Sequence, residues 1–571
     1  MRVLLTTLNA KYIHAALGIH TIKAYSESHG FEVIVQEYTI NQDLGWILSH
    51  LMRREPEVLG ISCNIWNVEE TKALIRRIKK IAPKILLIIG GPEFSAAPES
   101  FIDCGADFGI VGEGEKPFLG LLQALTTGKP YDAIPGVVWR DGERQRTNPV
   151  ASPISLDELA FPYSEDVLRA PGRIFYYETM RGCPFSCSYC LSGTEKVIRK
   201  RSLDQVFADL ERLVAAGIRQ VKFVDRTFNA DPRRCERILS YIIEHYGDSG
   251  VNFHMELVAE LLDDPLMALL NQAPKGLFRA EVGIQSLHAP TLMAVHRHVN
   301  PVRLEQNLRN LLQPQNIPIH LDLIAGLPEE GWEEFAGTFD STFNLRPAEI
   351  QLGILKLLKG SELGRKGREL GYLVIDEAPY EILETPWLSF GEIQRLKTMA
   401  HLVEVLYNSG HFRHALPLLL SGEGRSPFQM LDRLVSRWEQ EALDILPPNL
   451  KQIFDFLRVS VQELLPIEAG QTIIELLRMD RALADWSFDQ GEGWGTPPDL
   501  PETLSTLLSD ECWVEQNLPM MLELKPAERR RRVRRLTLKV DPRYPVSGFH
   551  TAQIILYRPL KGRVGYMVLE V

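Results

Sequence analysis

The sequence of 571 residues lacks an obvious export signal or membrane-spanning segment. Met1–Thr7 has the pattern of a buried strand, without the long apolar core and small-residue cleavage site of a secretory signal. The apolar run Ile85–Ile89 is far shorter than the ~20 residues that a membrane-spanning helix needs. These absences favour a cytoplasmic protein without membrane contact.

An excess of positive charge is also missing. Lys and Arg total 63 against 74 Asp and Glu, which gives a formal net charge of −11. This balance argues against nucleic acid as a partner. Hydrophobic residues make up 45% of the chain, as in ordinary globular proteins, and a chain of this length is expected to form more than one domain.

Cysteine is scarce and unevenly placed. Only seven cysteines occur, and Cys183, Cys187 and Cys190 lie close together in the sequence. An odd, clustered set in a chain without an export signal indicates metal binding in a reducing compartment, and not disulfide bonds.

Residues 1–148 alternate short apolar runs with helical patterns. The runs are almost continuously apolar, as in strands of a parallel sheet that is covered on both faces. We therefore predict a doubly wound, Rossmann-like α/β domain. Residues 149–173, rich in proline and polar groups, are predicted to form a linker. The predicted strands are Val3–Leu8, Phe31–Tyr38, Val58–Cys63, Ile85–Ile89 and Phe108–Val111.

A second alternation of strands and helices covers residues 174–378. Six βα units with right-handed crossovers would form an open, partial (β/α)6 barrel related to the TIM barrel. The alternation stops at residue 379, and we predict a mainly helical region up to residue 571 that ends in a small β element. The barrel strands are predicted at Ile174–Thr179, Gln220–Val224, Asn252–Leu257, Arg279–Ile284, Ile319–Ile324 and Ile350–Leu355, and the terminal strands at Thr551–Tyr557 and Gly565–Val571 around a Lys561–Gly562 turn.

The clustered cysteines have the spacing C-x3-C-x2-C, which lets one loop wrap three thiolates around one face of an iron–sulfur cube. Because a cube has four irons, one iron stays open to an external ligand. A structural zinc loop is the alternative, but such sites usually include a fourth Cys or His at a paired spacing, and none follows closely. The cysteines also follow the first barrel strand, at the end where the active sites of such barrels lie.

This spacing resembles the radical S-adenosylmethionine (SAM) superfamily, in which the amine and carboxylate of SAM chelate the open iron of a 4Fe–4S cluster. The stretches KFVDRTFN (Lys222–Asn229), GIQS (Gly283–Ser286) and GLPEE (Gly326–Glu330), at successive strand ends, are similar to stretches of that superfamily. One departure is Arg226, which stands where a second acidic residue is frequent and which could pair with Asp225. The resemblance implies metal ligands at Cys183, Cys187 and Cys190 and SAM contacts at Tyr189, Asp225, Arg226, Glu256, Gln285, Ser286 and Gly326.

The strand ends of the first domain carry glycine and small polar residues, as in GGPEFS (Gly90–Ser95) and VGEGE (Val111–Glu115). Glycine at such an edge lets the backbone approach a bulky ligand. The arrangement resembles the cobalamin-binding domain that precedes many radical SAM enzymes; a docking or vestigial module is the alternative. His14 lacks the preceding Asp of cobalt-ligating histidines, so we predict a helix-start role for it. The resemblance implies cobalamin contacts at Thr7, Asn9, Ser62, Asn64, Gly90, Gly91, Pro92, Gly112, Glu113 and Gly114.

Together the resemblances imply an enzyme that uses a 4Fe–4S cluster, SAM and cobalamin to methylate an unactivated carbon of a small-molecule or peptide substrate. A cobalamin-assisted radical cyclase or rearrangement enzyme and a non-catalytic iron–sulfur sensor are the alternatives. A reducing partner such as flavodoxin or ferredoxin is expected.

The C-terminal third resembles a subgroup of such enzymes with a C-terminal extension, and it carries two conspicuous local patterns. The basic run Arg529–Arg535 is predicted to be a solvated helix face, because acidic residues flank it and the net charge is negative. His411–His414 is predicted to be a packed helix end, because no partner for its polar side chains is evident in the sequence.

Overall fold

The computed structural model describes residues 1–142, 144–194, 196–485, 494, 499–543, 552–560 and 563–569. The predicted Lys561–Gly562 turn lies outside these residues. The chain forms two compact units. The first contains residues 1–335, 345–348 and 353–393, and the second contains 336–344, 349–352 and 394–571. None of the helices in the described ranges combines the length and the apolar character that a bilayer span requires.

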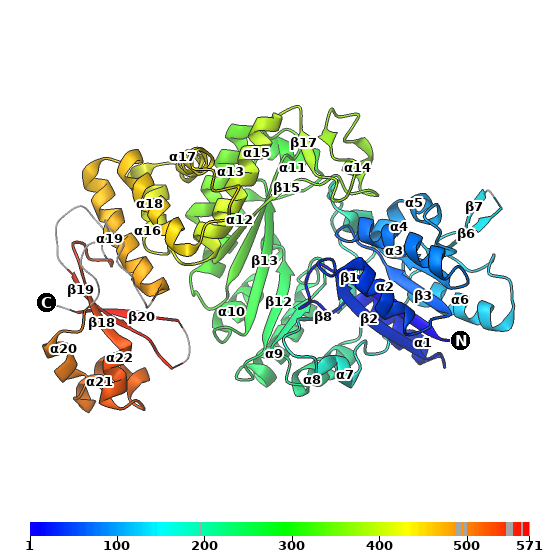
Figure 1. Ribbon diagram of the computed structural model, residues 1–571, viewed down its shortest axis with the longest axis horizontal. Helices are drawn as coiled ribbons and strands as arrows, with labels where there is room; N and C mark the ends of the chain where they lie inside the picture. The colour runs from blue at the N-terminus through cyan, green and yellow to red at the C-terminus, as the bar shows by residue number, and fades with distance from the viewer. Residues whose placement is uncertain are drawn as a thin grey trace. The chain divides into compact units, whose positions relative to one another are not determined.

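The N-terminal sheet of the first unit has seven strands in the order β2-β1-β3-β4-β5-β6-β7 (Figure 1). The pairs from β2 through β5 are parallel, and β6 and β7 add antiparallel strands at one edge. This confirms the predicted doubly wound α/β fold. The strands are β1 (Val3–Asn9), β2 (Val33–Thr39), β3 (Val58–Ser62), β4 (Leu86–Gly90), β5 (Phe108–Ile110), β6 (Val137–Asp141) and β7 (Arg144–Thr147).

Helices cover both faces of this sheet. α1 (Leu17–Glu27) and α6 (Glu115–Thr127) pack on one face, and α2 (Leu44–Met52) and α3 (Val68–Ile81) pack on the other. α3 forms because its apolar residues recur at helical spacing, with acidic residues in its first turn and lysines in its last turn that oppose the helix dipole. Since both faces are covered, the strands carry the continuous apolar runs seen in the sequence.

The strand order reverses between β1 and β3. From β1 the chain continues to β2 on one side, and from β3 it continues to β4 on the other side. In open parallel sheets, ligands bind beyond the carboxyl ends of the strands at such a switch point. The topology therefore places the ligand-binding edge at the ends of β1, β3, β4 and β5.

The barrel sheet has six strands in the order β8-β11-β12-β13-β14-β15, and the pairs from β8 through β14 are parallel. This confirms the predicted partial barrel. Its strands are β8 (Phe175–Tyr177), β11 (Gln220–Phe223), β12 (Asn252–Leu257), β13 (Phe278–Gln285), β14 (Ile319–Ala325) and β15 (Glu349–Ile354), and its principal helices are α8 (Leu203–Ala215), α9 (Pro232–Tyr246), α10 (Asp264–Gln272), α12 (Pro301–Leu312) and α13 (Trp332–Asn344).

The two faces of the barrel strands differ in exposure. Along β13 and β14, buried and half-buried residues alternate strictly. Successive side chains of a strand point to opposite faces, so the buried, apolar set packs under the helices and the half-buried set lines the barrel interior.

The second unit is mainly helical and ends in a small β element, as predicted. This element is a three-stranded antiparallel sheet, with one strand more than predicted. Trp438, Phe454 and Leu457 are among its most buried side chains. Its elements include α16 (Ala415–Ser421), α17 (Pro427–Gln440), α18 (Leu450–Leu464), α19 (Ile467–Ala484), α20 (Glu502–Leu507), α21 (Glu511–Asn517), α22 (Pro526–Arg532), β18 (Val533–Leu538), β19 (Ala552–Tyr557) and β20 (Gly565–Leu569).

The prediction of a solvated helix face at Arg529–Arg535 holds only for Arg530 and Arg531, which are exposed on α22. α22 ends at Arg532, and β18 begins at the next residue. Arg529 is buried, and its guanidinium donates hydrogen bonds to the carbonyl oxygens of Met521, Leu508 and Leu522. Residues 533–538 form a strand because they pair with β19. Val533, Leu536 and Leu538 are buried there, and the polar residues between them are half-buried or exposed.

Candidate functional site

A cavity of about 740 Å³ lies at the switch-point edge of the N-terminal sheet. It is lined by the residues that follow β1, β3, β4 and β5 and by the first turns of α1 and α6. A volume of several hundred Å³ suits a large organic ligand. The predicted cobalamin positions that line this cavity are Asn9, Ser62, Asn64, Gly90, Gly91, Pro92, Gly112, Glu113 and Gly114.

Thr7, the remaining predicted position, faces the sheet instead. Its hydroxyl donates a hydrogen bond of 2.9 Å to the Ser62 carbonyl, and its side chain is buried. Thr7 therefore ties the end of β1 to the end of β3.

Gly91 has a structural requirement for glycine. Its φ is +107°, and a Cβ atom there would lie 2.3 Å from the Cys63 carbonyl oxygen. Its missing side chain lets the β4–α4 turn pack against the end of β3, with α4 at Pro92–Ala96. Gly112, with φ of +86°, forms the corresponding turn after β5. Together the two turns form a cradle of backbone at the cavity edge, which fits a bulky ligand.

The barrel closes the other side of this cavity. Tyr176, Glu178, Arg181, Val224 and Arg226 line it from β8, β11 and the segments that follow them. The cavity is thus shared between the N-terminal sheet and the barrel within the first unit.

Arg181 joins the two walls of the cavity and lies two residues before the first clustered cysteine. Its guanidinium is 2.9 Å from Glu113, 2.6 Å from Glu115 and 2.9 Å from Glu178. Burial would lower the pKa of Arg181, but Glu178, Glu115 and Glu113 raise it. Arg199 also contacts Glu113. The loop after β5 is therefore fixed to the segment that carries the cysteines, and the Glu113 carboxylate is already engaged.

A second ion pair holds the start of the barrel against the N-terminal sheet. Arg173 donates hydrogen bonds of 2.9 Å to both carboxylate oxygens of Glu37 on β2, and His20 contacts the same carboxylate at 2.9 Å. Burial alone would raise the pKa of Glu37, but His20 and Arg173 lower it to about 2. Bidentate geometry and burial make this the stronger kind of ion pair.

His14 lines the cavity, and its Nδ1 atom lies 2.7 Å from the Tyr176 hydroxyl. Burial lowers its pKa. It lies ahead of α1 and bridges to β8, since its backbone pairs with Ile174. The predicted helix-start role of His14 is therefore wrong, because α1 begins at Leu17 with Ala16 as its N-cap. His14 instead joins this segment to the barrel.

The three clustered cysteines follow β9 (Met180–Arg181) on one loop. Cys183 is buried, with its Sγ atom 3.5 Å from Thr227 Oγ1, and Cys187 and Cys190 are half-buried. Burial raises the pKa of Cys187, and the nearby Cys190 and Cys183 add to this effect. The described residues contain no ready group of three His, Cys, Asp or Glu side chains at metal-binding distances. The donor set, three thiols on one loop, fits an iron–sulfur cube with one open iron, and the ligand assignment stays a prediction.

The predicted SAM positions divide into firmly engaged residues and less firmly held ones. Asp225 is fully buried and accepts a hydrogen bond of 2.8 Å from the Thr179 backbone N–H; burial raises its pKa to about 7. Ser286 is fully buried and donates to Glu330. The hydroxyl of Tyr189 lies 3.4 Å from Arg297. These three side chains are therefore already engaged within the protein.

Gly326 is also enclosed. A Cβ atom there would lie 2.1 Å from Ile382, and its φ is +92°. Its carbonyl oxygen accepts a hydrogen bond of 3.1 Å from Tyr372. The end of β14 is therefore packed beneath the strand pair β16 (Leu373–Val374) and β17 (Ile382–Glu384).

Glu256, Arg226 and Gln285 are held less firmly than the other predicted SAM positions. Arg226 is 3.9 Å from Glu256, so it pairs with this residue and not with Asp225. Gln285 has a φ of +67°, and its Oε1 atom is buried without a hydrogen-bond partner among the described residues. A strained backbone and an unsatisfied polar atom together mark a position that is suited to a ligand.

Sequence reasoning missed a polar layer inside the barrel, below these strand ends. Lys222 Nζ lies 3.0 Å from Glu281, His254 lies 3.4 Å from the same carboxylate, and His320 lies 3.3 Å from Asp322. Burial raises the pKa of Asp322 to about 8, and Glu281 and Glu256 add to this effect. The nearby His254 and Lys222 side chains hold the pKa of Glu281 well below its usual range. The alternation of polar residues along β11 to β14 is the signal that could have identified this layer.

Three family models match successive parts of the chain. Residues 3–122 match the B12 binding domain, residues 177–342 match the radical SAM superfamily, and residues 368–548 match a family of proteins of unknown function, DUF4080.

Curated relatives and solved structures point the same way. The chain is 28% identical over 326 residues to the cobalamin-dependent radical SAM methyltransferase TokK of Streptomyces tokunonensis, covering 53% of this chain and 47% of that protein. It is 27% identical over 304 residues to 2-(S-pantetheinyl)-carbapenam-3-carboxylate methyltransferase of Streptantibioticus cattleyicolor, covering 49% and 44%. The chain thus spans about half the length of these relatives.

Among solved structures, the cobalamin-dependent SAM radical enzyme OxsB with aqua-cobalamin bound aligns with a TM-score of 0.59 at 15% identity, over 86% of this chain and 82% of that chain. The radical SAM methyltransferase TsrM from Kitasatospora setae, with cobalamin and a [4Fe–4S] cluster bound, aligns with a TM-score of 0.55 at 18% identity, over 66% and 76%. At these identities the alignments show a shared fold.

Proposed function

We propose that this chain, which combines a B12 binding domain with a radical SAM domain and is homologous to cobalamin-dependent radical SAM methyltransferases, transfers a methyl group to an unactivated carbon atom. The observation that carries the proposal is the shared cavity. One wall is the glycine-lined edge of the N-terminal sheet, and the other comes from the barrel segment that leads into the three cysteines.

The residues divide into two sets that would hold the cofactors. Cys183, Cys187 and Cys190 would hold the 4Fe–4S cluster, and Gln285, Glu256 and Arg226 offer polar groups to SAM. Gly91, Gly112 and their neighbours would hold cobalamin by backbone contact. When bound, the cluster and SAM supply a carbon-centred radical by reductive cleavage, and cobalamin supplies a transferable methyl group.

The chain itself orients these groups. Arg181 and Arg173 fix the sheet edge to the barrel, so that the two halves of the site keep one separation. Holding reactants in one geometry removes much of the entropic barrier to their reaction. The polar layer around Glu281 and Asp322 offers hydrogen-bonding groups to a substrate in the barrel. An external electron donor such as flavodoxin or ferredoxin would reduce the cluster.

Product analysis tests the proposal. The protein is purified anaerobically after expression with hydroxocobalamin, reconstituted with iron and sulfide, and incubated with SAM and a strong reductant. A methyltransferase consumes SAM in two ways, so both S-adenosylhomocysteine and 5′-deoxyadenosine should form. 5′-Deoxyadenosine alone would contradict methyl transfer and favour a cyclase or rearrangement enzyme. Neither product, with an intact cluster, would contradict the enzymatic function and favour a sensor.

A further inference from the structure

A second cavity, of about 500 Å³, lies wholly within the second unit. Its lining includes residues 410–485, inside the stretch that matches DUF4080, and residues 558–564, which lie beyond that match. Three segments meet there: the residues around His411, the end of α19, and the residues that flank β19 and β20. Its volume lies in the range of small-molecule sites. The structure thus gives the His411–His414 pattern the partners that the sequence did not reveal.

The cavity collects three arginines from these distant parts of the chain: Arg413, Arg558 and Arg563. Within the described part of the chain, no carboxylate forms an ion pair with any of them. All three side chains are exposed, so an anion can reach them from solvent. The chain carries a net charge of −11, so this local excess runs against the average of the molecule.

Two acidic residues also line the cavity, and neither is free to neutralise the arginines. Asp480 is buried and accepts hydrogen bonds from the His414 ring at 2.5 Å, from the His414 backbone N–H at 3.1 Å and from the Ala415 N–H at 2.9 Å. Its carboxylate therefore anchors the segment that carries Arg413. Asp485 is also engaged in a contact of its own.

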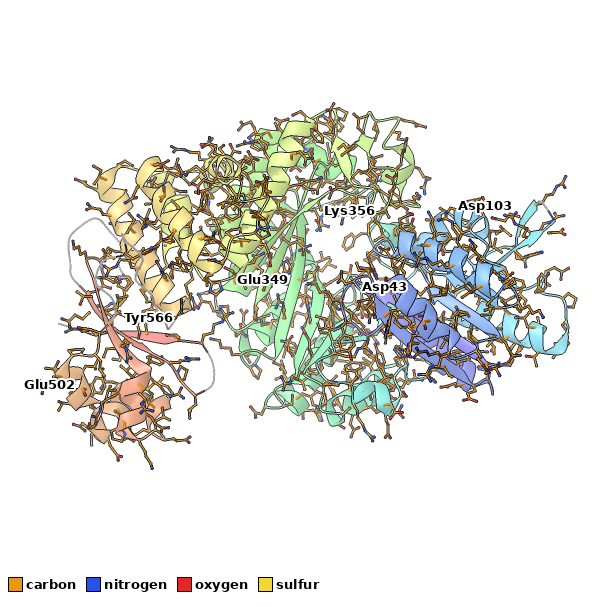
Figure 2. All side chains as sticks on the ribbon, viewed as in Figure 1. Asp43, Asp103, Glu349, Lys356, Glu502 and Tyr566 are labelled. Carbon is orange, nitrogen blue, oxygen red and sulfur yellow. The ribbon has the colours of Figure 1, made fainter. Side chains whose placement is uncertain are left out.

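The surroundings of His411 and His414 indicate that the cavity is positively charged and that its lining is held in place. Burial lowers the pKa of His411, and the nearby Arg563 and Arg413 lower it further, against the opposing effect of Asp480. On the other side, Tyr566, labelled in Figure 2, packs edge-on against His414 at a ring-centre distance of 5.2 Å. Tyr566 lies on β20. The position of His414 is therefore fixed from both α19 and the terminal sheet.

We propose that this cavity binds the phosphoryl group of a small phosphorylated molecule, with Arg413, Arg558 and Arg563 as its anchors. Planar guanidinium groups donate paired hydrogen bonds that match phosphate oxygens. Three guanidinium groups match an anion with more than one negative charge better than they match a single carboxylate. A concave site of this volume on an acidic chain favours a small molecule over a nucleic-acid strand.

The test is isothermal titration calorimetry of the full-length protein, with inorganic pyrophosphate as the probe. Saturable binding is expected for the wild type, and about tenfold or weaker binding for Arg413→Ala/Arg563→Ala, which corresponds to about 1.4 kcal/mol or more. Arg433→Ala removes an exposed arginine of α17 outside the cavity and should bind as the wild type does. Inorganic phosphate in a competition arm distinguishes free phosphate from a larger phosphoryl ligand, according to which binds more tightly.

Several results would overturn the proposal. These are the absence of saturable binding at millimolar pyrophosphate, undiminished binding in the double variant, and equally strong competition by acetate, which would indicate a carboxylate site. Binding of single-stranded RNA that pyrophosphate does not displace would indicate a nucleic-acid surface instead. If the double variant is unfolded by circular dichroism, Arg558→Gln, at an exposed position, takes its place with the same expected loss. Binding requires neither cluster nor corrinoid, so this test is independent of the proposed methyl transfer.

Discussion

Asp322 lies in the polar layer of the barrel interior, near Glu281 and Glu256. Its pKa is raised to about 8 by burial and by Glu281 and Glu256, from an ordinary value of 3.8. Between these two pH values the folded state keeps a proton that the unfolded state has lost. The contribution of Asp322 to stability is therefore complete below about pH 4 and is lost as the pH rises through about 8.

This assignment predicts the behaviour of Asp322→Asn. An amide keeps a hydrogen-bond donor toward Glu281 and cannot ionise, so the fall in melting temperature between about pH 6 and 8 should be shallower than in the wild type. The measurement is a series of thermal melts over pH. Asp248→Asn, at an exposed position, serves as the control and should follow the wild-type profile. Identical profiles for Asp322→Asn and the wild type would show that Asp322 is ionised at neutral pH.

The cluster ligands are tested by comparing two cysteines. Cys183→Ala should lower the iron content of reconstituted protein from about four atoms per chain to near zero, because two thiolates hold a cube poorly. Cys512 is exposed and distant in sequence from the cluster loop, so Cys512→Ala should keep its iron. Iron and sulfide analysis of anaerobic samples measures both. A full cluster in Cys183→Ala would contradict the assignment.

At the scale of elements, the contact between the loop after β5 and the cysteine segment depends on Arg181. Arg181→Ala would leave Glu113, Glu115 and Glu178 close together without their shared cation. Removing one partner from a buried ionic network costs about 3–5 kcal/mol, so we expect a loss of about 3 kcal/mol in the free energy of unfolding, together with reduced corrinoid retention.

Denaturant unfolding and the visible spectrum of the purified protein measure these two effects of Arg181→Ala. Arg169→Ala breaks an exposed i,i+4 pair with Glu165 and should change stability by about 0.5 kcal/mol or less. Arg181→Lys keeps the charge but loses the three-way contact, so it should fall between the wild type and Arg181→Ala. If Arg181→Ala retained wild-type stability and corrinoid content, the arginine would have no positioning role.

Helices and strands could be predicted from the sequence where the local pattern of apolar and polar residues determines them. The strand over Ile319–Ile324 was predicted to within one residue of β14, because buried and half-buried residues alternate there. β18 was missed because its arginines interrupt the apolar pattern in the sequence. Its three apolar residues become buried only when the strand pairs with β19. The β9–β10 pair, which joins Met180–Arg181 to Arg199–Lys200, was missed because each strand has only two residues, too few to show a pattern.

At the scale of the whole molecule, the order of sheet, barrel and helical region followed from strand–helix alternation. The contacts that define the site did not. Arg181 meets Glu115 across 66 residues, and Arg199 meets Glu113 across 86. No local pattern encodes such contacts, since they depend on how two sheets approach each other. The same holds for Arg413, Arg558 and Arg563, which only folding brings to one cavity.

The central claim is that the glycine-lined cavity and the cysteine loop form one site for two cofactors. Electron paramagnetic resonance of anaerobic protein loaded with cob(II)alamin and a reduced 4Fe–4S cluster tests this claim most directly. We predict that spin coupling to the cluster broadens or splits the cob(II)alamin signal and that Cys183→Ala restores the narrow signal with corrinoid still bound. An identical cob(II)alamin signal in both proteins, at full occupancy of corrinoid and of the wild-type cluster, would contradict the account.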